Sequence, residues 1–163
     1  MRIVVHCFGK LRIPGMRETA DFYLKRFRTW GEIQERELRA EPISDKSRSC
    51  RARVMEREDQ ILLASLGAPT PRFYLLSPDG KPKESMQWAE ALNDWQRSGA
   101  NAIHLCIGAS LGFSATMRKR ASGLLGLGPQ IFAHELARIA LYEQLYRAAS
   151  INGGHPYHNG GLG

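Results

Sequence analysis

The C-terminal part of the chain gathers histidine, glutamate, arginine and tyrosine in an order that could support proton transfer and anion binding. A helical run opens with His134-Glu-Leu-Ala-Arg138 and contains Glu143-Gln-Leu-Tyr-Arg147, and a tail reading His155-Pro-Tyr-His158 follows it. A histidine can accept a proton near neutral pH, an arginine can stabilise a developing negative charge, and a tyrosine can position either group. The candidate catalytic residues are His134, Arg147, Tyr157 and His158.

Each of these candidates also has an ordinary structural explanation. Glu143 and Arg147 stand four residues apart, which is the spacing of an ion pair on a helix surface. His134 could simply satisfy backbone groups at the start of a helix. His155 and His158 have no cluster of Cys, Asp or Glu nearby in the sequence, so we predict no metal site.

Glycine-rich turns form a second group of candidate functional residues. An apolar run over residues 103–107 ends in Gly108-Ala-Ser-Leu-Gly112, and a Gly-rich apolar stretch spans residues 123–132. Glycines let backbone N–H and C=O groups approach a ligand closely, although they also serve in tight turns that bind nothing. The turns lack the spacing of a dinucleotide fingerprint and the Lys-Ser/Thr of a P-loop, and Ser110 and Ser114 lack the context of a hydrolase nucleophile.

The scaffold expected to position these residues is an α/β domain. Strands are expected over residues 2–8, 33–38, 73–76 and 102–107. Helices are expected over residues 16–30 and 54–66, before Gly99 and from His134 onward. This alternation predicts a mostly parallel sheet with helices on both faces, and ligands bind such sheets outside the carboxyl ends of the strands.

Four local features accompany this pattern. The charged segment 33–38 is typical of an edge strand, and residues 41–53 are expected to form a mobile basic loop. Gly67 is expected to end the helix before it in a left-handed C-cap, and residues 77–81 to form a turn after a short strand.

Composition limits the class of protein. A chain of 163 residues with 43% apolar residues suits one domain over residues 1–163, and a net charge of +7 favours a polyanionic partner such as nucleic acid. The three cysteines are widely spaced and are expected to be free thiols. No apolar run reaches the roughly 18 residues of a membrane span and the start lacks the layout of a signal peptide, so we expect a cytoplasmic protein.

Short motifs along the whole chain carry a resemblance to a known family. They include Phe8-Gly-Lys10, Tyr23-Leu-Lys-Arg26, Leu76-Ser-Pro-Asp-Gly-Lys81, His134-Glu-Leu-Ala-Arg138, Glu143-Gln-Leu-Tyr-Arg-Ala148 and His155-Pro-Tyr-His158. In this order and without large gaps, the chain resembles the ribosomal RNA large-subunit methyltransferase H family, a small branch of the SPOUT methyltransferases.

The resemblance implies a SPOUT-type fold with a C-terminal trefoil knot, a homodimer, and S-adenosylmethionine as cofactor. It implies methylation of N3 of a pseudouridine in 23S rRNA at the subunit interface, with the assembled ribosome as substrate. The N3 proton must then leave, either to a side-chain base or with the help of a positive neighbour. The cofactor contacts carried over from the family are Leu76, Gly108, Leu127, Gly128, Pro129, Gln130, Ile131 and Phe132.

The chain departs from the family pattern in three places. Ala109 replaces the second glycine of the turn, Gly128-Pro-Gln-Ile replaces a Ser-rich loop, and the extra tail 159–163 is expected to be flexible. A methyl group at position 109 could crowd a ligand that lies against the backbone. The alternative to the enzyme is therefore a catalytically silent member of the same fold that binds RNA or the ribosome.

Basic side chains are the expected contacts to RNA phosphates, although they could also form an ordinary solvated face. They are Lys25, Arg26, Arg28, Arg48, Arg51, Arg53, Arg118, Lys119 and Arg120.

Overall fold

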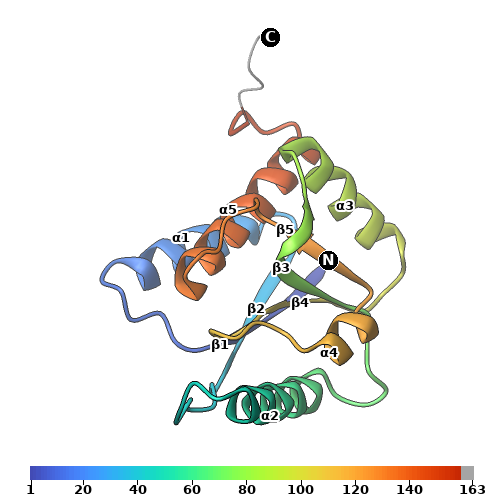
Figure 1. Ribbon diagram of the computed structural model, residues 1–163. Coiled ribbons are helices and arrows are strands. Elements are labelled where there is room, and N and C mark those ends of the chain that lie inside the picture. Colours follow the sequence, from blue (N-terminus) through green and yellow to red (C-terminus); the bar gives the residue numbers. More distant parts are fainter. Residues whose placement is uncertain (159–163) are drawn as a thin grey trace.

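A computed structural model describes residues 1–158 as an α/β sandwich around one parallel sheet (Figure 1). The elements follow in the order β1 (Arg2–Phe8), α1 (Met16–Phe27), β2 (Glu32–Leu38), α2 (Arg48–Leu66), β3 (Phe73–Pro82), α3 (Ser85–Arg97), β4 (Ile103–Ile107), α4 (Ala115–Arg120), β5 (Gly123–Gly126) and α5 (His134–Asn152). The five strands pair in the order β2-β1-β4-β3-β5, and every pairing is parallel. The predicted α/β class and the edge position of the charged strand β2 are confirmed.

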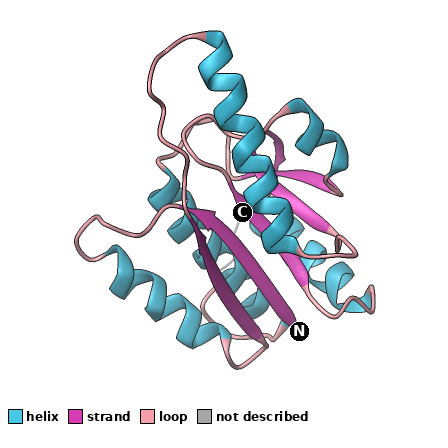
Figure 2. Cartoon of the chain, turned by 90° about the horizontal axis from the view of Figure 1, so that it is seen from below, coloured by secondary structure: helices cyan, strands magenta, loops and turns pink. Residues whose placement is uncertain are grey.

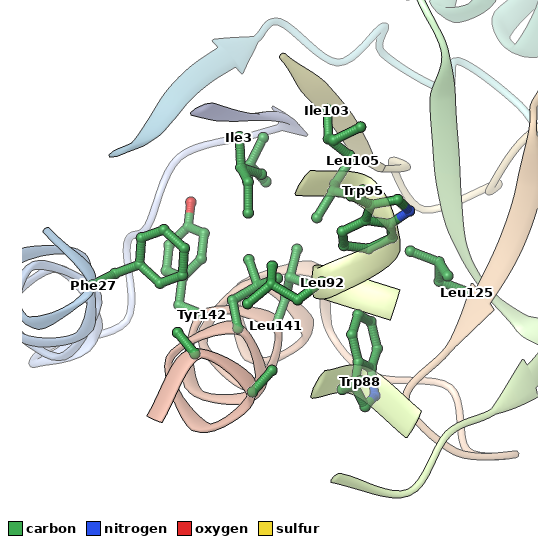
Figure 3. Packing of buried hydrophobic residues seen from close by; sticks show 14 of the residues in the cluster. Ile3, Phe27, Trp88, Leu92, Trp95, Ile103, Leu105, Leu125, Leu141 and Tyr142 are labelled. Atoms are coloured by element: carbon green, nitrogen blue, oxygen red, sulfur yellow. The ribbon is translucent and has the colours of Figure 1, made fainter. Parts of the chain in front are cut away.

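Helices cover both faces of the sheet, as the sequence predicts. On one face α1, α3 and α5 pack on alternate side chains of β1 and β4, around Ile3, Trp88 and Leu141 (Figure 3). On the other face α2 and α4 pack on Phe8 and Phe73 through their own apolar side chains. Because successive strand residues point to opposite faces, the continuous apolar runs of β1 and β4 supply both cores. Figure 2 views the molecule from the α2 side.

The helix expected over residues 54–66 begins earlier, at Arg48. The hydroxyl of Ser47 accepts a hydrogen bond from the Cys50 N–H at 3.2 Å and caps the helix. Cys50 and Val54 then bury one face of the first turns. The loop prediction for residues 48–53 was therefore wrong, because a buried cysteine and a serine cap outweigh the polar composition. Gly67 ends the helix with φ +90° but an extended ψ of 179°, so its cap is not left-handed helical.

The turn expected at residues 77–81 is part of a longer strand. β3 pairs with β5 at Leu76, bulges, and resumes its pairing at Lys81. The partner strand β5 lies in the stretch that the sequence analysis treated as a loop. Gly80 is required here, since a Cβ at this position would lie 2.5 Å from the Leu125 carbonyl carbon. The trefoil knot and the single domain over residues 1–163 stay predictions, and the tail 159–163 lies outside the described residues.

The remaining sequence expectations concern thiols and membrane segments. Cys7, Cys50 and Cys106 are free and buried, which confirms the prediction of free thiols. Within residues 1–158, no helix combines the length and the apolar character that crossing a membrane requires.

Candidate functional site

A cavity of about 440 Å³ opens where β4 and β5 end and β3 bulges. Its wall consists of the bulge, the turn after β4, the loop between β5 and α5, and the first turn of α5. This is the carboxyl edge of the sheet, where α/β folds bind ligands. Residues predicted to bind the cofactor that line the cavity are Leu76, Gly108, Leu127, Gly128, Gln130, Ile131 and Phe132. Pro129 is not part of this lining.

The turn after β4 closes tightly on itself. The Gly112 N–H donates to the Ala109 carbonyl at 3.0 Å, and Gly112 has φ +71°, where a side chain would be strained. A Cβ on Gly108 would lie 3.2 Å from the Gly112 Cα. Ala109 does not adopt positive φ, and it packs on the core beneath α2 and α4. The alanine at this position therefore leaves the turn unstrained.

The loop between β5 and α5 forms an apolar rim on the cavity. Gly128, near the start of this loop, has φ +149°, a backbone conformation that residues with a side chain rarely adopt. Ile131 is 88% exposed, and Phe132 and Leu136 are also exposed beside it. Large apolar side chains that face solvent together mark a surface suited to a ligand or a partner.

His134 lies in the cavity wall, and its neighbour Glu135 fixes the adjoining loop. The Glu135 carboxylate accepts backbone hydrogen bonds from Arg12 at 2.6 Å and Ile13 at 2.9 Å. The bond from Ile13, together with that from Arg12, holds the pKa of Glu135 below its usual value. This contact brings Gly9 against His134, where a Cβ would lie 2.7 Å from the imidazole Nε2. His134 is therefore partly buried in the wall of the same cavity.

The other three candidate catalytic residues form a separate cluster around Glu143. The Glu143 Oε1 accepts hydrogen bonds from Arg147 Nε at 2.9 Å and from the Tyr157 hydroxyl at 3.1 Å. The Arg147 guanidinium stacks over the Tyr157 ring at 4.8 Å, and its Nη1 lies 3.5 Å from the His158 Nδ1. Glu143 and Arg147 therefore form the ion pair that their spacing predicts, and they also contact Tyr157 and His158 of the tail.

Charge and burial keep Arg147 and Tyr157 of this cluster protonated. The hydrogen bond to Glu143 raises the pKa of Arg147. Burial raises the pKa of Tyr157, and Glu143 raises it further, so that its phenol stays protonated at neutral pH. A guanidinium can only donate, so Arg147 is the donor to the His158 Nδ1, which leaves the other ring nitrogen, Nε2, to carry a proton. The Arg147–Glu143 ion pair has no net charge, and the cluster presents N–H donors of Arg147 and His158.

Aromatic packing holds the tail against the body of the fold. The ring of Tyr157 packs on Tyr146 with centroids 4.5 Å apart, and His155 packs edge-on against Trp30 at 6.0 Å. A Cβ on Gly153 would lie 2.5 Å from the Trp30 Nε1, so the chain can turn closely past this ring. These contacts place Tyr157 and His158 beside Arg147.

Sequence comparison gives this geometry a context. A family model described as "Predicted SPOUT methyltransferase" matches residues 1–158. "Ribosomal RNA large subunit methyltransferase H" of Rhizobium meliloti (strain 1021) is 34% identical over 158 residues, which cover 97% of this chain and 99% of the relative. The protein of the same name from Streptococcus thermophilus (strain ATCC BAA-491 / LMD-9) is 34% identical over 161 residues, with the same coverage. The chain belongs to the SPOUT methyltransferases. Within them it belongs to the large subunit methyltransferase H family, as its motifs predict.

In this SPOUT chain the two groups of candidate residues lie at opposite ends of α5. Thirteen residues separate His134 from Arg147, which corresponds to about 20 Å along a helix axis. Figure 1 shows α5 running from the loop that follows β5 to the tail. Within one subunit, His134 therefore lines the cavity, whereas Arg147, Tyr157 and His158 do not.

The cavity of this SPOUT chain also has lining residues that the sequence did not single out. They include Ser77 and Pro78, which follow Leu76 directly, and Ala137, which lies in the first turn of α5. Arg118, expected to contact RNA phosphates, lines the cavity and pairs with Asp79 at 2.7 Å. Among residues 1–158, there is no group of three His, Cys, Asp or Glu side chains that could hold a metal ion.

Proposed function

We propose that this protein is an S-adenosylmethionine-dependent methyltransferase that methylates N3 of a pseudouridine in 23S rRNA. The supporting observation is the cavity at the carboxyl edge of the sheet. It is lined by residues carried over from the family, and the chain belongs to the SPOUT methyltransferases. The names of the relatives support a large-subunit rRNA substrate. The assembled ribosome in the cytoplasm is the proposed form of that substrate.

The residues present fit such a cofactor. A volume of about 440 Å³ lies in the range of pockets that hold small ligands, roughly 300–1,000 Å³. Leu76, Leu127 and Ile131 offer apolar contacts to a heterocyclic base, and the turn at Gly108 exposes backbone donors and acceptors at close range. When bound, S-adenosylmethionine supplies a methyl group on a positively charged sulfur, ready for transfer to a nucleophile.

The tail cluster is proposed to make N3 nucleophilic. A neutral imide-like nitrogen has little lone-pair density, so its proton must leave before or during transfer. Arg147, held by Glu143, stabilises the negative charge that remains, and His158 donates from Nε2 to orient the base. Tyr157 holds Arg147 in place by stacking and by its own bond to Glu143. We assign the proton to solvent, and His134 to the cavity wall.

A homodimer is proposed to bring the cavity together with the cluster of Arg147, Tyr157 and His158. In the proposed dimer the Arg147 cluster of one subunit faces the cavity of the other, so that each active site needs both chains. Ile131, Phe132 and Leu136 lie beside the cavity and are exposed, which suits burial at a subunit interface. The separation of about 20 Å along α5 supports this arrangement.

The test is transfer of a labelled methyl group to ribosomes purified from cells that lack this enzyme. The proposal predicts one methyl group per large subunit, located by mass spectrometry as N3-methylpseudouridine in 23S rRNA. A Gly108→Arg variant that still folds should transfer none, because the arginine fills the cavity. Ribosome binding without transfer by the wild-type protein would favour the silent binding member instead.

A further inference from the structure

Exposed cations gather at the carboxyl edge of the sheet, on the side covered by α2 and α4. We call this set the carboxyl-edge basic surface. It comprises Lys46, Arg48, Arg51 and Arg53, all of which are exposed. They stand where the chain leaves β2 and enters α2. Loops that leave parallel strands meet at one edge, which is also the edge of the cavity.

The helix that carries this surface is fixed to α4. The Ser114 hydroxyl, which caps α4, donates a hydrogen bond to the Asp59 carboxylate in the middle of α2. Met117 of α4 and Leu62 of α2 share one apolar cluster under the sheet. Arg118 of α4 lines the cavity itself. These contacts hold α2 against α4, which contributes to the cavity wall.

The charges on this surface are available to a partner. Among the described residues, none of its four cations forms an ion pair, whereas Arg57 of α2 and Arg118 of α4 pair with Glu41 and Asp79. The nearby acidic groups are engaged: Asp45 accepts the Ser47 N–H at 2.7 Å and Asp59 accepts the Ser114 hydroxyl. The exposed Glu56 is the remaining acid on this stretch of α2.

The basic residues of α1 differ in position. A helix that connects two parallel strands runs antiparallel to them, so the C-terminal end of α1 lies at the amino edge of the sheet. Lys25, Arg26 and Arg28 stand at that end, on the opposite face from α2 (Figure 1). Arg26 also stacks over the Phe22 ring at 4.2 Å. These cations lie away from the cavity.

We propose that the carboxyl-edge basic surface binds the phosphate backbone of the RNA substrate and leads it to the cavity, and that the α1 cations do not. This inference rests on the proposed function only in that the partner is RNA. Cations along such a surface bind RNA phosphates by releasing counterions, which makes the affinity fall with salt. Among the basic residues expected to contact phosphates, the proposal therefore gives those of α2 a different role from those of α1.

The experiment compares three charge-reversal variants that each change the net charge by the same amount. They are Arg48→Glu/Arg51→Glu, Lys46→Glu/Arg53→Glu and, as the matched control, Lys25→Glu/Arg26→Glu. Binding of purified large ribosomal subunits is measured at several salt concentrations, with circular dichroism to verify the fold. The first two variants should bind at least tenfold more weakly and lower the salt slope by about 2, given roughly 0.9 for each phosphate contact. The control should change affinity by less than about threefold.

Two results would overturn the inference. One is a control that loses as much affinity as the carboxyl-edge variants, and the other is wild-type affinity in both of those variants. Failure of the proposed function has a different signature, because titration with S-adenosylmethionine and methyl transfer are measured separately. A wild-type protein that binds the subunits through this surface but transfers no methyl group would refute the enzyme and leave the surface in place. A wild-type protein that binds no subunits contradicts the surface directly.

Discussion

Arg138 of α5 donates a hydrogen bond from Nε to the Glu35 carboxylate of β2 at 2.8 Å, across 103 residues of sequence. The Arg138 side chain is 1% exposed, and Glu37 accepts from its Nη2 at 3.0 Å. The edge strand is charged because its carboxylates neutralise this buried cation. The contact fixes α5, which carries both groups of candidate residues, to the far edge of the sheet.

Replacing Arg138 by alanine should lower the free energy of unfolding by about 3–5 kcal/mol, because Glu37 loses the cation it bonds to and Glu35 keeps only Arg17 and the Tyr142 hydroxyl. Chemical denaturation monitored by circular dichroism measures the change. Arg97→Ala is the matched control, since Arg97 forms an exposed ion pair with Asp94 and should cost less than about 1 kcal/mol. A loss below 1 kcal/mol for Arg138→Ala would show that the buried pair contributes little.

The buried histidine pair beneath α2 predicts a loss of stability in mild acid. The His6 Nε2 lies 2.9 Å from the His104 Nδ1, and the His6 Nδ1 lies 2.8 Å from the Ser65 hydroxyl. Burial, with smaller contributions from the nearby His104 and Arg36, lowers the pKa of His6 to about 3. Between pH 6.5 and 3 the unfolded chain therefore binds a proton that the folded chain rejects, so stability is full above pH 6.5 and falls as the pH decreases.

Thermal unfolding of wild type and His6→Gln between pH 7.5 and 4.5 checks this prediction. The melting temperature of the wild type should fall toward pH 4.5, and the variant should lose part of that slope while it is less stable at pH 7.5. His155→Gln serves as the control because His155 is exposed, and its slope should match the wild type. Equal slopes in wild type and His6→Gln would exclude His6 as the source.

The close approach of β3 and β5 gives a prediction about glycine. A Cβ on Gly80 would lie 2.5 Å from the Leu125 carbonyl carbon and 2.6 Å from the Gly126 nitrogen, where only backbone could move aside. We expect Gly80→Ala to destabilise the fold by about 3 kcal/mol or to prevent soluble expression. Gly123→Ala on the same strand pair is the control, because its Cβ would meet the Tyr74 ring at an ordinary 3.4 Å. Equal stability of the two variants would refute the close packing.

The proposed composite site predicts complementation between two inactive variants. Gly108→Arg blocks the cavity and Arg147→Ala removes the charge from the tail cluster, so each homodimer should be inactive. Mixed dimers from co-expression hold one intact site of two. After purification through two different affinity tags, which isolates the mixed dimers, they should recover about half of wild-type methyl transfer. No recovery in verified mixed dimers would mean that each site is built within one chain.

Much of the fold could be predicted from the sequence because its signals are local. The apolar runs of β1 and β4 and the spacing of Trp88, Leu92 and Trp95 in α3 correspond to the observed elements. The start of α2 was missed because it depends on one serine cap, and β5 because Gly123-Leu-Leu-Gly126 is a strand only through its pairing with β3.

The candidate site could be predicted only in part. The parallel topology places a ligand at the carboxyl edge, and the resemblance supplied the residues that line the cavity there. The distance between His134 and Arg147 follows from the helix rise, yet it becomes meaningful only once the cavity is located. The bonds from the Arg12 N–H to Glu135 and from Arg138 to Glu35 join residues more than a hundred positions apart, and no local pattern encodes them.

Calorimetric titration with S-adenosylmethionine tests the central claim most directly, because every step of the proposed function needs this ligand in the cavity. The account predicts one binding site per subunit in the wild type, and none in a Gly108→Arg variant whose circular dichroism spectrum is unchanged. Arg147→Ala should bind as the wild type does, since Arg147 does not line the cavity of its own chain and its proposed role is to stabilise the RNA base. No binding by the wild type, or equal binding by Gly108→Arg, would contradict the assignment of this cavity to the methyl donor.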